Sequence, residues 1–185
     1  MNKIYEDITI VTVLYNSKKS VQDFFSNLEN FSIIVVDNGR NEKVLDKIKD
    51  YKNIKVISKN KNIGYGSAVN FAVQNVTTRF FLILNPDLKI NEKSIDNMHD
   101  ILNQYNDCAI VAPVTLFSKD FYGAFPEKNI KNVKLKNALK SRDLLLNSEV
   151  ESEVCVDVAK WALLIKVEEF KNIRERLIEI SNKLG

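Results

Sequence analysis

The 185-residue sequence has little cysteine and histidine, with two cysteines and one histidine. A zinc site needs a cluster of such ligands and a Ser-His-Asp type triad needs an oriented histidine, so both kinds of site are nearly excluded. Cys108 and Cys155 lie in apolar runs, and we expect buried, unreactive thiols in a reduced compartment. His99 lies in a polar stretch, and we expect it on the surface without a catalytic role.

Long apolar runs are also missing. None approaches the roughly 20 residues that a membrane-spanning helix needs, and residues 1–7 lack the apolar core of a signal peptide. We therefore expect a soluble, cytoplasmic protein, and association with the inner face of a membrane stays open. The 27 basic and 24 acidic residues are spread along the chain, a balance too even to indicate nucleic-acid binding.

Short β-branched runs alternate with helix-like stretches through the first half of the chain. We expect strands at residues 8–14, 33–36, 54–57, 80–84 and 109–112. Between them, apolar residues at helical spacing predict helices at 17–29, 42–51, 64–76 and 94–105. Strands and helices that alternate in this way predict an α/β fold with a mostly parallel central sheet flanked by helices.

The second half is less regular. We expect an irregular excursion at 115–132, a helix at 133–146, strands at 154–158 and 161–165, and a charged amphipathic helix at 168–184. The length and the 45% of apolar residues suit one domain with a sizeable core, so we predict a single domain over residues 1–185.

Two expected strands end in a carboxylate. The apolar run 80–84 is followed by Asn85-Pro86-Asp87, and the run 33–36 by Asp37. Ligands of open α/β sheets bind at the carboxyl ends of the strands, and Mg²⁺ or Mn²⁺ is commonly held by one or two carboxylates plus substrate phosphates. Asp87 is therefore a candidate metal ligand. A capped turn before the next helix is the alternative, and the recurrence of a strand-end carboxylate at Asp37 favours the ligand site.

Two further strand ends leave alternatives open. Asp37-Asn38-Gly39 can accept hydrogen bonds from a base or a ribose, or can form an Asx-turn that closes the strand. Tyr15-Asn16-Ser17 can support a base and present a helix N-terminus to an anion, but for this turn alone an ordinary N-cap is favoured.

The segment 60–70 contains Gly64 and Gly66 at the expected start of a helix. Glycines there permit a positive φ or close approach of a ligand to the backbone. A dinucleotide fingerprint is disfavoured because Val69 stands where its third glycine would be, and no Gly-Lys-Ser/Thr of a P-loop follows. Close packing of the helix on the sheet is the alternative reason for these small residues.

These four segments, in this order, resemble the inverting GT-A glycosyltransferases of family 2, especially the rhamnosyltransferase-like branch. The matching residues are 12–17, 35–39, 62–70 and 84–87. The resemblance implies the GT-A fold and transfer of a sugar from a dTDP- or UDP-sugar to a glycan or lipid-linked acceptor, in surface polysaccharide biosynthesis. A nucleotidyltransferase of similar topology is disfavoured because no glycine-rich loop bearing Arg and Lys lies near the first strand.

The resemblance also implies the site. Asn85 takes the place of the first Asp in the family's Asp-x-Asp motif, so Asp87 is its only certain anionic ligand for Mg²⁺ or Mn²⁺. The implied residues for binding the nucleotide sugar are Val13, Tyr15, Asn16, Asp37, Asn62, Gly64, Gly66, Asn70, Asn85 and Asp87.

The resemblance is strong over residues 7–115, the expected nucleotide-sugar-binding half, and weaker over 116–185, a partial acceptor-side half. Family members follow a segment like 156–166 with a glycine-rich aromatic loop and an acidic pair that supplies the general base. Here Trp161-Ala162 replaces the usual Gly-Ala, and the amphipathic stretch 168–185 follows. The acidic pair Glu168-Glu169 comes too early, and glutamates are common at a helix start.

We therefore leave the catalytic base unknown, and the oligomeric state open. A truncated, non-catalytic nucleotide-sugar-binding module that works with a partner is the alternative function.

Overall fold

The computed structural model describes residues 4–17, 21–39, 41–59, 61–106, 108–113, 124–125, 155–156 and 162–184. The chain divides into two compact units, one formed by Met1–Val111 with Trp161–Gly185 and the other by Ala112–Lys160. In the second unit the structure describes a pair of antiparallel strands, β6 (Ala124–Phe125) and β7 (Cys155–Val156). The helix predicted at 133–146 lies outside the described residues.

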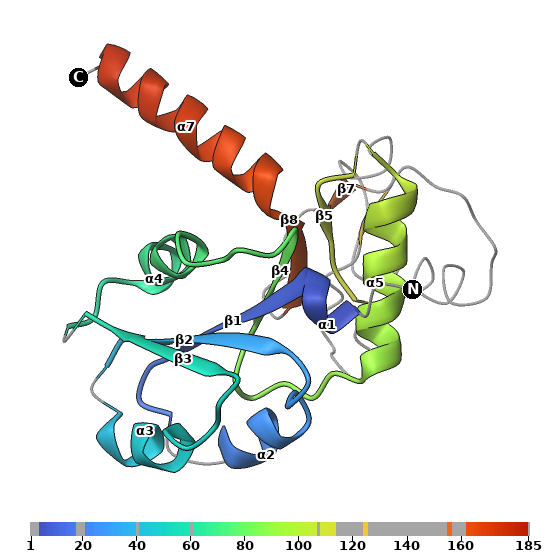
Figure 1. Cartoon of the computed structure of the whole chain (residues 1–185). Coiled ribbons are helices and arrows are strands. Elements are labelled where there is room, and N and C mark those ends of the chain that lie inside the picture. Colours follow the sequence, from blue (N-terminus) through green and yellow to red (C-terminus); the bar gives the residue numbers. More distant parts are fainter. Residues whose placement is uncertain are drawn as a thin grey trace, which may run out of the picture. The chain divides into compact units, whose positions relative to one another are not determined.

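The first unit is built on a six-stranded sheet with the strand order β3-β2-β1-β4-β8-β5 (Figure 1). Four strands are parallel, and β8 is antiparallel to both of its neighbours, β4 and β5. The α/β fold with a mostly parallel central sheet, predicted from the sequence, is confirmed. The strands are β1 (Ile8–Leu14), β2 (Ser32–Asp37), β3 (Ile54–Ser58), β4 (Phe80–Leu84), β5 (Ile110–Val111) and β8 (Ala162–Lys166).

The register places the ends of the central strands at one edge of the sheet. Leu14 of β1 pairs with Asp37 of β2, and Val11 pairs with Ile83 of β4. The chain leaves β3 and crosses to the far side of β1 to form β4, so the strand order reverses beside β1. The carboxyl edge at such a reversal is where open α/β sheets bind their ligands.

Helices cover both faces of the sheet. The described helices are α1 (Ile4–Asp7), α2 (Val21–Ser26), α3 (Glu42–Ile48), α4 (Tyr65–Val73), α5 (Glu92–Gln104) and α7 (Val167–Leu184). Figure 1 shows α4 on one side of the parallel strands, and α2 and α3 on the other. Among these helices none combines the length and hydropathy that a membrane crossing requires.

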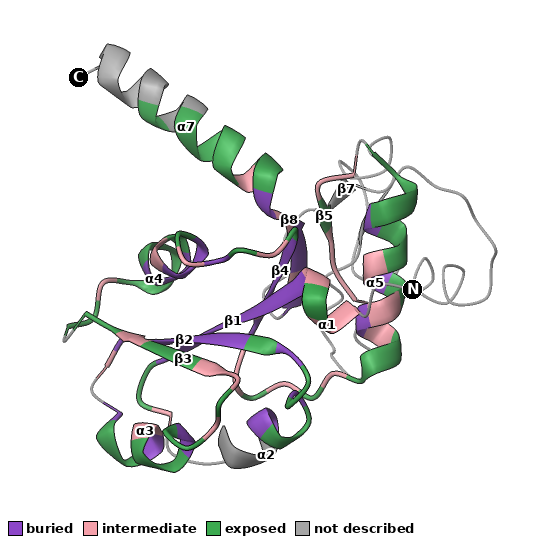
Figure 2. Ribbon diagram, viewed as in Figure 1, coloured by how far each residue is buried: buried purple, intermediate pink, exposed green. Residues whose placement is uncertain are grey.

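The hydrophobic core has two layers, one on each face. Ile8, Ile10 and Leu14 of β1 pack with α2, α3 and α5, whereas Val11 and Val13 pack with α4. The strand supplies both layers because its successive side chains point to opposite faces. Figure 2 shows β1 buried along its length, as a strand covered on both faces must be.

The expected exposure of His99 and the expected burial of Cys108 were both wrong. His99 is not a free surface side chain, since its Nε2 lies 2.8 Å from Asp7 Oδ2 and both side chains are 13% exposed. The contact between Asp7 and His99 could not be predicted from the sequence, because Asp7 precedes β1 and His99 lies on α5. Only the folded chain brings the two residues together. Cys108 is a free thiol but is half-buried rather than buried.

Candidate functional site

Asp37 ends β2 and is 5% exposed. Its Oδ1 accepts hydrogen bonds from the backbone N–H of Gly39 at 3.2 Å and from both the backbone N–H and the side-chain amide of Asn41, at 3.3 and 3.1 Å. Its Oδ2 accepts one from the Ser58 hydroxyl at 3.3 Å. The bond from Gly39 is an Asx-turn, so Asp37 does close the strand. Because a carboxylate has about four acceptor positions, Oδ2 retains capacity for a ligand.

Asn38 connects the end of β2 to the loop before α4. It is 3% exposed, and its Nδ2 donates to Asn62 Oδ1 at 3.0 Å, while its Oδ1 accepts from the Ile63 N–H at 2.9 Å. Asn62 Oδ1 also accepts from the Gly64 N–H at 2.9 Å. The predicted residues Asn62 and Gly64 are thereby tied to the Asp37 turn.

Gly64 is the N-cap of α4 and has a φ of 82°, in the left-handed region that favours glycine. The exposed Gly66 has open space where a side chain would be, so its backbone is accessible. Asn70 is exposed further along α4. Ala68 and Ala72 are fully buried against the sheet, so close packing accounts for these alanines but not for the exposed Gly64 and Gly66.

The turn after β4 is tied to the same helix start. Asn85 Oδ1 accepts a hydrogen bond from the Tyr65 hydroxyl at 3.1 Å. Burial raises the pKa of Tyr65 above its ordinary value of 10.0, which keeps the hydroxyl a neutral donor. Asp87 is exposed, and within the described part of the chain its carboxylate has no hydrogen-bond or ion-pair partner.

The turn after β1 lies against the Asp37 turn. Tyr15 is 55% exposed, and its ring lies so close to Gly39 that a Cβ built there would be 2.6 Å from Tyr15 Cδ2. Asn16 has a φ of 50°. Val13, also predicted for the site, is 7% exposed and packs in the core on the α4 side, so its side chain is not available to a ligand.

These contacts bring the four predicted segments to one edge of the sheet. We found three participants from the structure that the sequence did not single out: Asn41, Ser58 and Tyr65. Ser58 could have been predicted from the sequence, because it is a polar residue at the end of an expected strand, and that strand lies next to β2. Asn41 precedes a predicted helix, where Asn is ordinarily interpreted as a cap.

The donor groups suit a hard cation. The described residues contain no group of three or more His, Cys, Asp or Glu side chains that could hold a metal alone. An exposed carboxylate at Asp87, two residues from the amide oxygen of Asn85, fits Mg²⁺ or Mn²⁺ that takes its remaining ligands from water and phosphate.

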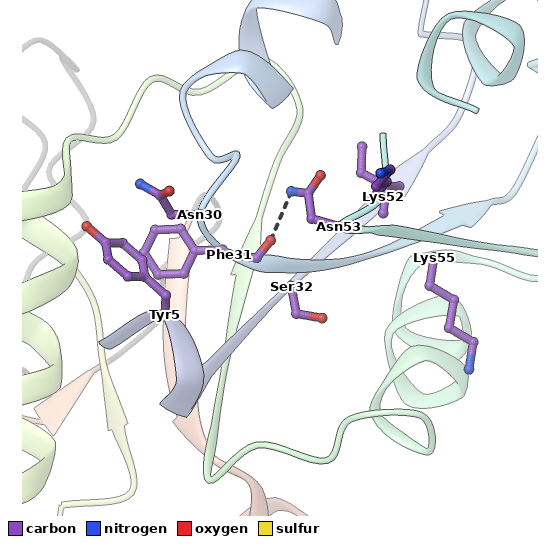
Figure 3. Close-up of a pocket in the computed structure, with 8 residues that line it drawn as sticks. Tyr5, Asn30, Phe31, Ser32, Lys52, Asn53 and Lys55 are labelled. Atoms are coloured by element: carbon purple, nitrogen blue, oxygen red, sulfur yellow. Dashed lines mark hydrogen bonds between the residues drawn. The ribbon is translucent and has the colours of Figure 1, made fainter. Parts of the chain in front are cut away.

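An open depression of about 390 Å³ lies elsewhere (Figure 3). Ser32 and Ile54, the first residues of β2 and β3, place it at the amino edge of the sheet, away from the candidate site. Two of its lining residues are joined by a hydrogen bond from Asn53 Nδ2 to the Phe31 carbonyl, at 3.0 Å (Figure 3). The lining residues are Tyr5, Asn30, Phe31, Ser32, Lys52, Asn53, Ile54 and Lys55.

The fold and the residues at the carboxyl edge agree with a sequence match. The chain belongs to glycosyl transferase family 2, whose family model matches residues 9–158. It is 29% identical over 128 residues to the teichoic acid poly(glycerol phosphate) polymerase of Staphylococcus epidermidis, covering 64% of this chain and 17% of that protein. It is 25% identical over 112 residues to the low-salt glycan biosynthesis hexosyltransferase Agl10 of Haloferax volcanii, covering 58% and 36%.

Solved structures share the fold. Residues 1–349 of S. aureus TarS match with a TM-score of 0.56 and 16% identity, over 91% of this chain and 49% of that one. The same protein in complex with UDP-GlcNAc matches with 0.58 and 17%, over 91% and 47%. The mannosyltransferase PcManGT from Pyrobaculum calidifontis, in complex with GDP-Man and Mn²⁺, matches with 0.50 and 14%, over 72% and 38%. The chain spans less than half of the length of each of these relatives.

Proposed function

We propose that the carboxyl edge of β1, β2 and β4 binds a nucleotide-diphosphate sugar, as the donor site of a glycosyltransferase. The observation that carries this proposal is a set of three hydrogen bonds, from Asn38 to Asn62, from Gly64 to Asn62 and from Tyr65 to Asn85. They tie the end of β2, the start of α4 and the turn after β4 together at one edge of the sheet. The complexes of related folds with UDP-GlcNAc and GDP-Man support it. We favour a dTDP- or UDP-linked donor, and a rhamnosyltransferase-like role in surface polysaccharide biosynthesis.

Each part of the edge has a proposed partner on the donor. Asp37 Oδ2, which accepts one hydrogen bond from Ser58 within the described part of the chain, is proposed to accept another from a base N–H or a ribose hydroxyl, with the exposed Tyr15 ring against the neighbouring Gly39. The backbone at Gly64 and Gly66, at the start of α4, faces the diphosphate, because a helix N-terminus favours an anion. Asn16 and Asn70 are proposed as further polar contacts.

Asp87, with Asn85, would hold Mg²⁺ or Mn²⁺ on the diphosphate. When bound, the ion neutralises charge on the departing nucleoside diphosphate. The related mannosyltransferase in complex with Mn²⁺ supports this assignment. The chain's own residues orient the donor, while an acceptor hydroxyl from a glycan or lipid-linked acceptor displaces the diphosphate with inversion; the general base is unassigned.

We propose further that residues 1–115 form the donor half and 116–185 a partial acceptor half of a cytoplasmic protein; association with the inner face of the membrane stays open. The alternative is a non-catalytic nucleotide-sugar-binding module that works with a partner. One observation favours the alternative: on α7, Ile173 is 53% exposed and Ile178 is 45% exposed. Apolar side chains exposed on a helix can mark a contact surface.

Calorimetric titration of the 185-residue chain tests donor binding. UDP- and dTDP-linked sugars should bind, and Mn²⁺ should strengthen binding. Asp87→Asn should lower the affinity with Mn²⁺ by at least about tenfold, or ~1.4 kcal/mol, and leave the affinity without Mn²⁺ nearly unchanged. A folded chain that binds none of these nucleotides would refute the proposal. Sugar transfer that Asp87→Asn abolishes would exclude the non-catalytic alternative.

A further inference from the structure

We infer that Asn41 is a positioning residue of the donor site. It holds the Asp37 carboxylate so that Oδ2 is the oxygen offered to a ligand, and it fixes the Tyr15–Ser17 turn beside that carboxylate. The inference rests on the proposed function, and it assigns Asn41 no contact with the donor itself.

The first observation is that Asn41 lies at the N-cap position of α3 but its side chain does not cap the helix. Asn41 is the N-cap of α3, and its backbone carbonyl accepts from the N–H groups of Val44 and Leu45 at 2.8 and 2.9 Å. An N-cap Asn ordinarily turns its side-chain oxygen onto the first turn of the helix. Within the described part of the chain, the Asn41 side chain makes no such bond. Helix capping therefore does not explain this side chain.

The second observation is that the Asn41 side chain bonds to Asp37 and to Ser17. Asn41 is 8% exposed; its Nδ2 donates to Asp37 Oδ1 at 3.1 Å, and its Oδ1 accepts from the Ser17 N–H at 3.2 Å. A backbone N–H only donates and a carboxylate only accepts, so these two partners determine which end of the amide is nitrogen. One buried amide thus joins the turn after β1 to the end of β2.

The consequence is an oriented carboxylate. Within the described part of the chain, two of the three donors to Asp37 Oδ1 come from Asn41, whereas Oδ2 accepts a hydrogen bond from the Ser58 hydroxyl. Rotation of the carboxylate would break the Oδ1 bonds inside a buried setting, where an unpaired polar group costs about 1–3 kcal/mol. Asp37 and the turn bearing Tyr15 are therefore held in place before a ligand arrives, which lowers the ordering cost of binding.

Two substitutions separate positioning from folding. Asn41→Asp keeps an oxygen for the Ser17 N–H but sets a second carboxylate against Asp37. Asn41→Ala removes both bonds. Asn91→Asp is the matched control, because Asn91 caps α5 through its own side chain, by a 2.8 Å bond from the Ser94 N–H. UDP affinity with Mn²⁺ and thermal unfolding are measured for each, at a temperature where all are folded.

We expect both Asn41 variants to bind UDP at least about tenfold more weakly at pH 8. In Asn41→Asp the affinity should recover as the pH is lowered to about 5, because two adjacent carboxylates take up a shared proton and restore a donor toward Asp37 Oδ1. Asn41→Ala should show no recovery beyond that of the parent chain. The Ser17 amide should keep its protection from hydrogen exchange in Asn41→Asp and lose it in Asn41→Ala.

The outcomes distinguish the inference from the proposed function. Parent-like UDP affinity of folded Asn41→Ala would overturn the inference and leave the donor site intact. Loss of affinity in Asn41→Asp without recovery at low pH would also overturn it, since the hydrogen bond to Asp37 would not be the cause. A folded parent chain that fails to bind UDP would overturn the proposed function, and the inference would fall with it.

Discussion

Gly39 shows how a single residue shapes the site. A Cβ there would lie 2.6 Å from Tyr15 Cδ2 and 3.2 Å from Cε2, closer than side chains tolerate. The Gly39 N–H also donates to Asp37 Oδ1 at 3.2 Å. The absence of a side chain therefore allows the Tyr15 ring and the Asp37 turn to lie against each other.

Gly39→Ala should accordingly push the Tyr15 ring aside. We expect UDP affinity with Mn²⁺ to fall several-fold, with a small change in stability because Tyr15 is 55% exposed. Calorimetry in the parent and in a Tyr15→Ala background forms a double-mutant cycle, which isolates the contact between the two residues. In the Tyr15→Ala background Gly39→Ala should add little. Equal losses in both backgrounds would show that the ring is not the cause.

At the scale of elements, the Tyr65 hydroxyl joins the first residue of α4 to the turn after β4. It donates to Asn85 Oδ1 at 3.1 Å, and burial raises the Tyr65 pKa, so the bond persists through neutral and mildly alkaline pH. Tyr65 is 47% exposed, and the bond therefore contributes little to global stability. Its effect is on the relative placement of the two elements.

Tyr65→Phe keeps the ring and removes this bond. We expect UDP affinity with Mn²⁺ to fall several-fold, while the free energy of unfolding changes by less than about 1 kcal/mol. Tyr105→Phe is a matched control, because Tyr105 is 42% exposed at the end of α5, outside the site. Calorimetry and urea unfolding measure both quantities. Parent-like affinity in Tyr65→Phe would contradict a role for the bond in the donor site.

The strands could be predicted from the sequence because their apolar runs have sharp polar ends. β4 was predicted residue for residue, since Phe80–Leu84 lies between Arg79 and Asn85. Helix ends were predicted less well: the helix expected at 42–51 ends at Ile48, since the last turn of a helix is set by local hydrogen bonds rather than by apolar spacing. The four-residue α1 was missed because it is too short to show a period.

The candidate site was predictable only where a residue marks a strand end or a glycine-containing turn. Asp37 and Asn85 were identified in that way, and Asn62 and Gly64 from the glycine-containing turn. Asn41 was not, because its side chain meets partners in two other loops that only the folded chain brings together. Pairwise contacts of this kind depend on strand register and loop path, and neither is encoded in local spacing.

At the scale of the whole sheet, the two edges differ in what their polar groups do. Opposite the candidate site, Asp7 just before β1 binds two partners through Oδ2: His99 of α5 at 2.8 Å, and Arg79 just before β4 at 3.1 Å. The His99 ring also packs edge-on against Phe80, with centroids 5.1 Å apart. This cluster fastens the amino ends of two central strands to the helix that covers them.

Asp7→Ala should therefore destabilise the fold without weakening the donor site. Two hydrogen bonds to a largely buried carboxylate are lost, so we expect about 1–3 kcal/mol of destabilisation by urea unfolding. UDP affinity with Mn²⁺, measured where the variant is fully folded, should stay within about twofold of the parent, because sites that share no contacts behave nearly additively. A larger loss of affinity would mean that the amino edge helps to set the strand ends that carry Asp37 and Asn85. In that case the two edges would form one coupled unit, and the division between a stabilising edge and a binding edge would be wrong.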